Sequence, residues 1–218
     1  MEPKDDPGRV ILINKPFQWT SFDVVNKLRN RLKIKKVGHA GTLDPLATGL
    51  LIICTGKMTK RIEEFMGLEK EYTGKFILGK TTPSHDLETA ISEGKDISAL
   101  TTEHIQTAAQ GLTGILQQLP PMHSAIKIGG KRAYQFARRG EEIELKHREV
   151  DVKIFEITDI HLPEASFRII CSKGTYIRSI ARDLGNALGV GAYLSELCRT
   201  RIGTFKLENA LPIDEVTP

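Results

Sequence analysis

Alternation of apolar and polar side chains predicts several strands. Residues 70–78 and 167–171 alternate, and Tyr72, Phe76 and Leu78 would share one face of the first segment. Short apolar or alternating runs predict further strands at residues 10–13, 50–54, 124–128 and 150–154.

Apolar residues at helical spacing predict helices between these strands. Ser21 could cap a helix that carries Val25, Leu28 and Leu32 on one stripe. Further helices are expected at residues 58–66, 105–112, 133–139 and 177–188. Strands and helices do not alternate strictly, and the chain has no glycine-rich nucleotide motif. The pattern therefore predicts an α+β fold, with a mixed, largely antiparallel sheet flanked by helices.

Residues 80–98 form a long polar segment, KTTPSHDLETAISEGKDIS, without helical or strand periodicity. Segments of this length usually serve as binding loops or are mobile. We therefore expect an irregular loop here.

The composition is that of a soluble globular protein, with 218 residues and 40% hydrophobic side chains. The sequence has neither a signal peptide nor an apolar run long enough for a membrane span, so we expect a cytoplasmic protein with no membrane association. Cys54, Cys171 and Cys198 are far apart among apolar neighbours, which predicts reduced thiols and no metal site.

Basic residues form three clusters, although the net charge is only +4. They are Arg29, Arg31, Lys33, Lys35 and Lys36; Lys127, Lys131, Arg132, Arg138 and Arg139; and Arg199, Arg201 and Lys206. Each cluster could be a solvated face. Their position beside glycine-rich motifs favours a polyanionic partner, and nucleic acid in particular.

The segment VGHAGTLDPLATG, at residues 37–49, holds a single acid, Asp44, among three glycines and a proline. Asp-Pro forms turns, so Asp44 could serve only to hydrogen-bond its own backbone. Alternatively, the turn could hold the carboxylate rigidly and direct it into a cleft. The composition of the segment leaves both interpretations open.

A second segment with candidate chemistry is SKGTYIRSIARDLG, at residues 172–185. Arg178 could be a surface charge at a helix start, where the helix dipole disfavours it, or it could keep a carboxylate in a cleft ionised. Tyr72 could likewise be a core aromatic residue or a ring that stacks on a base.

Four segments, in this order, resemble the motifs of the TruB family of tRNA pseudouridine synthases. They are KVGHAGTLDPLATGLL, KEYTGKFILG, LPPMHSAIKIGGKRAYQFARRG and CSKGTYIRSIARDLG. The resemblance covers roughly residues 9–207. It implies the pseudouridine synthase fold with a central RNA-binding cleft, and isomerisation of the T-loop uridine at position 55 of tRNA without cofactor or metal.

The resemblance also assigns catalytic roles by position. Asp44 matches the catalytic aspartate of the family. Tyr176 matches a second active-site tyrosine, and Arg178 matches the arginine that pairs with the aspartate.

Substrate-binding and supporting roles follow in the same way. Tyr72 matches the tyrosine that stacks on the target uracil, and His39 the histidine that fills the space left by the flipped base. Leu197 falls at an apolar pocket position. Lys15 and Pro16 belong to a motif that supports the catalytic loop.

The resemblance further implies one catalytic domain over residues 1–218, with residues 80–98 as part of an RNA-gripping insertion. Family members commonly carry a C-terminal PUA domain, for which we expect no room after Pro218. The expected partner is the T-arm stem-loop of tRNA. No DNA and no obligatory protein partner are expected, and the chain should be a monomer.

Two other interpretations are kept. The first is a non-catalytic RNA-binding or tRNA-folding module on the same fold, which loss of Asp44 or Arg178 would indicate. The second is the same chemistry within a guide-RNA complex, as in dyskerin-like relatives.

Overall fold

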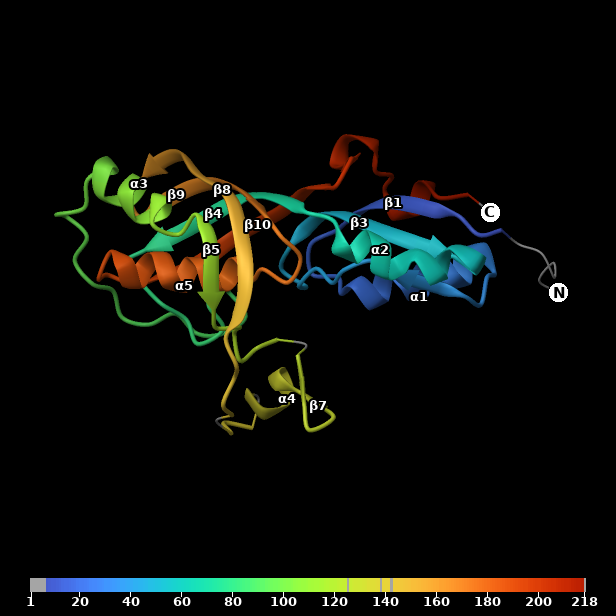
Figure 1. The fold of residues 1–218 in the computed structure, drawn as a ribbon, viewed down its shortest axis with the longest axis horizontal. Helices are drawn as coiled ribbons and strands as arrows, with labels where there is room; N and C mark the ends of the chain where they lie inside the picture. Colours follow the sequence, from blue (N-terminus) through green and yellow to red (C-terminus); the bar gives the residue numbers. More distant parts are fainter. Residues whose placement is uncertain (1–6, 125, 138, 142, 218) are drawn as a thin grey trace. The chain divides into compact units, whose positions relative to one another are not determined.

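The computed structural model describes residues 7–124, 126–137, 139–141 and 143–217. The chain divides into two compact units. Unit 1 consists of Met1–Thr73 and Glu196–Pro218, and unit 2 of Gly74–Ser195. Strands β4 (Lys70–Leu78) and β10 (Ala192–Ile202) contribute residues to both units (Figure 1).

Unit 1 is built around strand β3. Its other elements are β1 (Val10–Lys15), α1 (Ser21–Leu32), β2 (Val37–His39), η1 (Gly56–Arg61), α2 (Ile62–Gly67), β11 (Phe205–Lys206), η2 (Leu207–Asn209) and η3 (Ile213–Glu215). β3 (Thr48–Thr55) pairs antiparallel with β1 and β2 and parallel with β10. The parallel pairing places Arg199 opposite Gly49.

Both faces of β3 are buried, because alternate residues pack against different helices. Leu51 and Ile53 pack with the apolar stripe of α1. Leu50 and Ile52 pack with Phe65 of α2. This strand therefore gives a rigid support to the loop that precedes it, residues 40–47.

Unit 2 carries a sheet in the order β4-β9-β8-β5, in which β8 runs antiparallel to both β9 and β5. Its other elements are α3 (Thr102–Gln110), β5 (Gly114–Gln118), β6 (Lys127–Ile128), β7 (Lys131–Arg132), α4 (Ala133–Ala137), β8 (Arg148–His161), β9 (Glu164–Cys171) and α5 (Ile177–Ala187). Phe76 stacks on Phe167 at 4.1 Å between ring centroids, and both rings are buried in the core.

The predicted α+β fold class is confirmed: the sheet is mixed, largely antiparallel and flanked by helices. Two predictions were wrong in detail, and two strands were missed. The strand expected at residues 124–128 is limited to Lys127–Ile128, and residue 125 lies outside the described part of the chain. The helix expected at residues 58–66 is a 3-10 turn followed by α2. β5 and β10 were not predicted.

The helix cap was also assigned to the wrong residue. Thr20 caps α1, because its hydroxyl accepts from the N–H of Asp23 while the Asp23 carboxylate accepts from the N–H of Thr20. Ser21 instead bonds the backbone of Leu43. Its hydroxyl accepts from the N–H at 2.8 Å and donates to the carbonyl at 3.2 Å. This side chain therefore ties the start of α1 to residues 40–47.

Among the described residues, no helix has both the length and the apolar character needed to cross a membrane. All three cysteines are thiols that form no disulfide, and Cys54 and Cys171 are buried as expected, whereas Cys198 is partly exposed. Burial raises the pKa of the Cys54 thiol to about 11, so this thiol is protonated and unreactive at neutral pH.

Candidate active site

Asp44 lies in the turn between β2 and β3. The turn closes through the backbone carbonyl of Asp44, which accepts from the N–H of Ala47 at 3.1 Å. The next carbonyl, of Pro45, accepts from the N–H of Gln18 at 2.9 Å. Together with the Ser21–Leu43 bonds, these contacts hold the backbone on both sides of a partly exposed Asp44.

Lys15 supports this loop from β1. Its side chain is fully buried, and its ammonium group donates to the carbonyls of Trp19 (2.6 Å), Pro16 (2.9 Å) and Pro45 (3.4 Å). Burial lowers the pKa of Lys15 to about 8, while the charge of Asp44 acts in the opposite direction. The ammonium therefore joins the segment before α1 to the residue that follows Asp44.

Arg199 supports the same loop from β10. Its guanidinium donates to the carbonyls of Leu50 (2.8 Å), Gly41 (3.2 Å) and Thr42 (3.5 Å). The side chain is 1% exposed, so the expectation that it belongs to a polyanion-binding surface was wrong. It holds the backbone immediately before Asp44.

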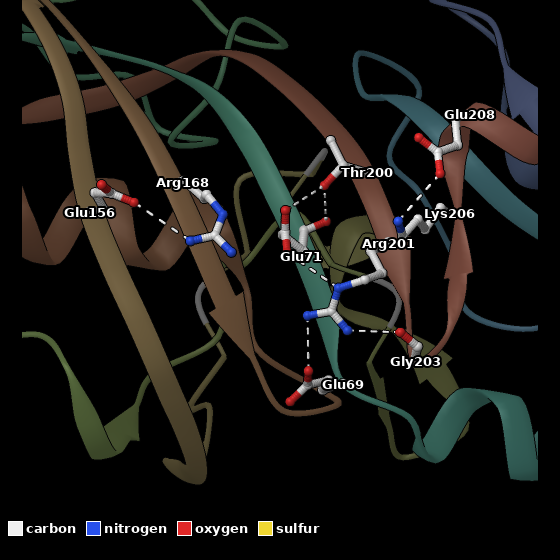
Figure 2. Close-up of polar contacts among 9 residues, drawn as sticks. All are labelled: Glu69, Glu71, Glu156, Arg168, Thr200, Arg201, Gly203, Lys206 and Glu208. Atoms are coloured by element: carbon white, nitrogen blue, oxygen red, sulfur yellow. Dashed lines mark hydrogen bonds and ion pairs between the residues drawn. The ribbon is translucent and has the colours of Figure 1, made fainter.

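For Arg201, too, the expected role in a polyanion-binding surface was wrong, but for a different reason. Figure 2 shows its guanidinium between two carboxylates, at 2.9 Å from Glu69 and 3.2 Å from Glu71. It also donates to the carbonyl of Gly203 at 2.8 Å. The third basic cluster thus consists mainly of side chains that hold β10 in place, and Lys206 itself pairs with Glu208 at 3.3 Å.

The predicted substrate-binding residues of unit 1 are His39, Tyr72 and Leu197. His39 ends β2 and is half-buried. Burial lowers its pKa, so the imidazole is neutral at pH 7, although a hydrogen bond to the Gly41 backbone acts against this shift. Tyr72 is buried on β4, and Leu197 is partly exposed on β10.

Unit 2 provides Arg178, which lies in the first turn of α5 with 3% of its surface exposed. A surface role for this arginine is therefore wrong. Its guanidinium forms an ion pair with the buried carboxylate of Asp86 at 3.4 Å and donates to the Ser84 carbonyl at 3.4 Å. The pairing of Arg178 with Asp44 stays a prediction.

Asp86 is a residue that the sequence analysis missed. Its carboxylate also accepts from the N–H of Glu88 at 2.9 Å, and its carbonyl accepts from the Thr82 hydroxyl at 2.6 Å. In the sequence, Asp86 is one acidic residue within the long polar segment at residues 80–98. Acidic residues are common in loops, so this position alone does not indicate a buried ion pair.

Tyr176 is half-buried at the N-cap of α5, and its own side chain makes no capping hydrogen bond. The side-chain amide of Gln118 on β5 forms hydrogen bonds with the backbone N–H and carbonyl of Tyr176. Within the part of the chain that the structure describes, no group of three or more histidine, cysteine or acidic residues is arranged to hold a metal ion.

Comparison with models of protein families identifies the family of this chain. Residues 29–177 match the model of the N-terminal domain of the TruB family of pseudouridylate synthases. Residues 178–218 match the model of a C-terminal domain of tRNA pseudouridylate synthase B. The chain belongs to the TruB family.

Curated family members share about half of their residues with this chain over nearly its whole length. The tRNA pseudouridine synthase B of Phocaeicola vulgatus is 51% identical over 213 residues, which cover 95% of this chain and 91% of that protein. The protein of the same name from Flavobacterium johnsoniae is 52% identical over 219 residues, covering 94% and 93%.

Solved structures show the same fold. The crystal structure of a Cbf5-Nop10-Gar1 complex matches with a TM-score of 0.74 and 31% identity over 94% of this chain. An H/ACA RNP bound to a substrate RNA containing 2′-deoxyuridine matches with a TM-score of 0.71 and 28% identity. This chain spans only about half of those two matched chains, 52% and 51%.

Proposed function

We propose that this chain is a tRNA pseudouridine synthase that isomerises the T-loop uridine at position 55. The observation that carries the proposal is identity of about half the residues, over nearly the full length, to relatives named tRNA pseudouridine synthase B. The bonds that hold the backbone on both sides of Asp44 support the proposal, because a reactive carboxylate must be held in one orientation.

The reaction exchanges one glycosidic bond for another. The N1–C1′ bond breaks, the uracil turns, and C5 bonds to C1′ while the C5 proton leaves and N1 gains a proton. Asp44 would either attack C1′ or act through a glycal-like intermediate. Both routes use the carboxylate in its ionised form.

Lys15 and Arg199 would contribute by fixing the loop before the substrate arrives. Their charged groups donate to carbonyls on both sides of Asp44. Groups that are already oriented need no rearrangement during the reaction, which lowers its barrier. Their positive charges would also favour the ionised carboxylate.

Arg178 would keep Asp44 ionised, as the family assignment implies. The ion pair with Asp86 and the bond to the Ser84 carbonyl orient its guanidinium. Because this guanidinium is buried, it interacts more strongly with a carboxylate than an exposed arginine would. Asp86 thus becomes a residue that orients the arginine.

The target base must leave its stack before it can react, which costs a few kcal/mol. Stacking on Tyr72 would offset part of this cost, by about 1–3 kcal/mol. The neutral imidazole of His39 would fill the vacancy in the RNA. Leu197 would exclude water, which could otherwise hydrolyse the activated sugar.

The proposal includes a cytoplasmic protein that acts on the T-arm stem-loop as a monomer, without an obligatory protein partner. The match to curated relatives over most of their length supports activity of the chain by itself. The H/ACA structures are complexes of longer chains, which makes a guide-RNA complex the weaker interpretation.

The test is tritium release by the purified chain alone. A tRNA transcript with tritium at C5 of uridine should release label to water, since formation of the C5–C1′ bond displaces the C5 hydrogen. A matched transcript with cytidine at position 55 should release none. Binding of both transcripts without release would favour the non-catalytic module, and equal release from both would place the modified uridine elsewhere.

A further inference from the structure

Gln118 binds both backbone groups of one residue, Tyr176. The Gln118 Oε1 accepts from the Tyr176 N–H at 2.8 Å, and its Nε2 donates to the Tyr176 carbonyl at 3.2 Å. The Gln118 side chain is 2% exposed, so water does not compete for these bonds. The amide therefore acts like the edge of a neighbouring strand and fixes the backbone of Tyr176 at two points.

The ring of Tyr176 is held from the strand beside Gln118. Gln118 on β5 stands directly opposite Arg148 on β8 in the antiparallel register. The Arg148 guanidinium carbon lies 5.9 Å from the centroid of the Tyr176 ring, within the range of a cation–π interaction. Two cross-strand neighbours thus contact the backbone and the ring of the same tyrosine.

The segment around Tyr176 needs this external support. The turn from β9 into α5 passes through Gly174, whose φ of +81° lies in the left-handed region that favours glycine. Tyr176 has extended backbone angles at the N-cap and no side-chain cap. Without Gln118, the Tyr176 N–H would have to find another partner, while the Tyr176 carbonyl would keep only its bond from the Ile180 N–H at 3.1 Å.

We propose that Gln118 is a positioning residue for the reaction, which fixes Tyr176 through its backbone while Arg148 fixes the ring. The inference rests on the proposed function and on the family resemblance, which assigns Tyr176 to the active site. A displacement of about 1 Å at a reacting group can cost roughly a hundredfold in rate, so two points of attachment matter for kcat.

The test compares Gln118→Glu with Gln117→Glu, its exposed neighbour on the same strand. A carboxylate at residue 118 can still accept from the Tyr176 N–H, but it repels the carbonyl. We expect kcat for tritium release to fall at least about tenfold, with KM for tRNA within about twofold. Gln117→Glu should stay within about twofold of wild type in both constants.

The pH dependence separates positioning from a general loss of structure. Burial beside a carbonyl raises the pKa of a carboxyl group, and the protonated group can again donate. The defect in kcat of Gln118→Glu should therefore be smaller at pH 6 than at pH 8. A defect equal at both pH values, or a kcat like that of Gln117→Glu, would overturn the proposal.

A measurement independent of activity keeps the two proposals distinguishable. The chain has four tyrosines, so 3-fluorotyrosine labelling gives four ¹⁹F signals, and Tyr176→Phe assigns one of them. Gln118→Glu should shift or broaden the Tyr176 signal and leave the other three unchanged. An unchanged Tyr176 signal would refute the clamp, whereas an inactive wild type would refute only the proposed function.

Discussion

Buried cations with carbonyl partners are the main feature of this molecule at the scale of single residues. Lys15 and Arg199 reach the Asp44 loop from two strands. The N–H groups of both side chains donate hydrogen bonds to backbone carbonyl oxygens. A charged group without water is costly unless its hydrogen bonds are satisfied. The loop and the two cations therefore stabilise one another.

Replacing Lys15 tests this mutual dependence. Lys15→Met keeps the length of the side chain but leaves the carbonyls of Trp19, Pro16 and Pro45 without their buried donor. We expect the free energy of unfolding to fall by about 1–3 kcal/mol, measured by urea denaturation. Lys27→Met, which removes only an exposed ion pair with Asp214, should change it by less than about 0.5 kcal/mol. Equal values for the two variants would contradict the role of Lys15.

The sequence does not distinguish arginines that bond to other segments of this chain from arginines that are available to bind RNA. Arg199 and Arg201 follow a cysteine and a threonine in the same short segment, yet one is buried among carbonyls and the other lies between two glutamates. Burial depends on long-range pairing of β10 with β3, which is absent from local composition. Motif position pointed to Asp44 and to Lys15, but not to Ser21 or Arg199, which hold the same loop.

At the scale of elements, residues 80–98 are a loop, as predicted, but one ordered by its own polar groups. The N–H of Ser92 donates to the Thr81 carbonyl at 2.9 Å, and the hydroxyls of Ser84 and Thr89 lie 2.8 Å apart. The loop also carries Asp86, the partner of Arg178. Its polar composition thus reflects internal bonds as well as exposure to solvent.

His85 makes this loop sensitive to acid. Burial and the charges of Arg182 and Arg178 lower the pKa of His85 to about 4, while the charges of Asp183 and Asp86 act in the opposite direction. In the unfolded chain the imidazole titrates near 6.5. Between pH 6.5 and 4 the unfolded state therefore binds more protons, and stability is lost as the pH falls through this window.

His85→Asn should remove this dependence, because asparagine carries no charge and tolerates the φ of +62° at this position. The free energy of unfolding of the variant should decrease less than that of wild type between pH 6.5 and 4.5. The exposed His147→Asn serves as the control and should keep the wild-type slope. Parallel slopes for wild type and His85→Asn would exclude this explanation.

The elements that could be predicted are those with a clear apolar period. The stripe on α1 and the alternation along β4 were read correctly, since one face of each is buried. β10 was not, because Glu196, Arg199 and Arg201 interrupt its alternation. Arg199 and Arg201 find their partners in other segments, including Leu50 of β3 and Glu71 of β4, and local sequence does not reveal such partners.

At the scale of the whole molecule, the two compact units do not follow the order of the sequence. Unit 1 combines the N-terminal residues with Glu196–Pro218, whereas the family models divide the chain at residues 177 and 178. Asp44 belongs to unit 1, and Tyr176 and Arg178 belong to unit 2. The interpretation of residues 1–218 as one catalytic domain stays a prediction.

The most direct test of the account is tritium release by Asp44→Asn. This change keeps the shape of the side chain and removes its charge, so the bonds that hold the loop backbone should persist. The variant should release no label from tRNA with tritium at C5 of uridine, while its affinity for tRNA stays within about threefold of wild type. Release at the wild-type rate would show that Asp44 is not the catalytic carboxylate.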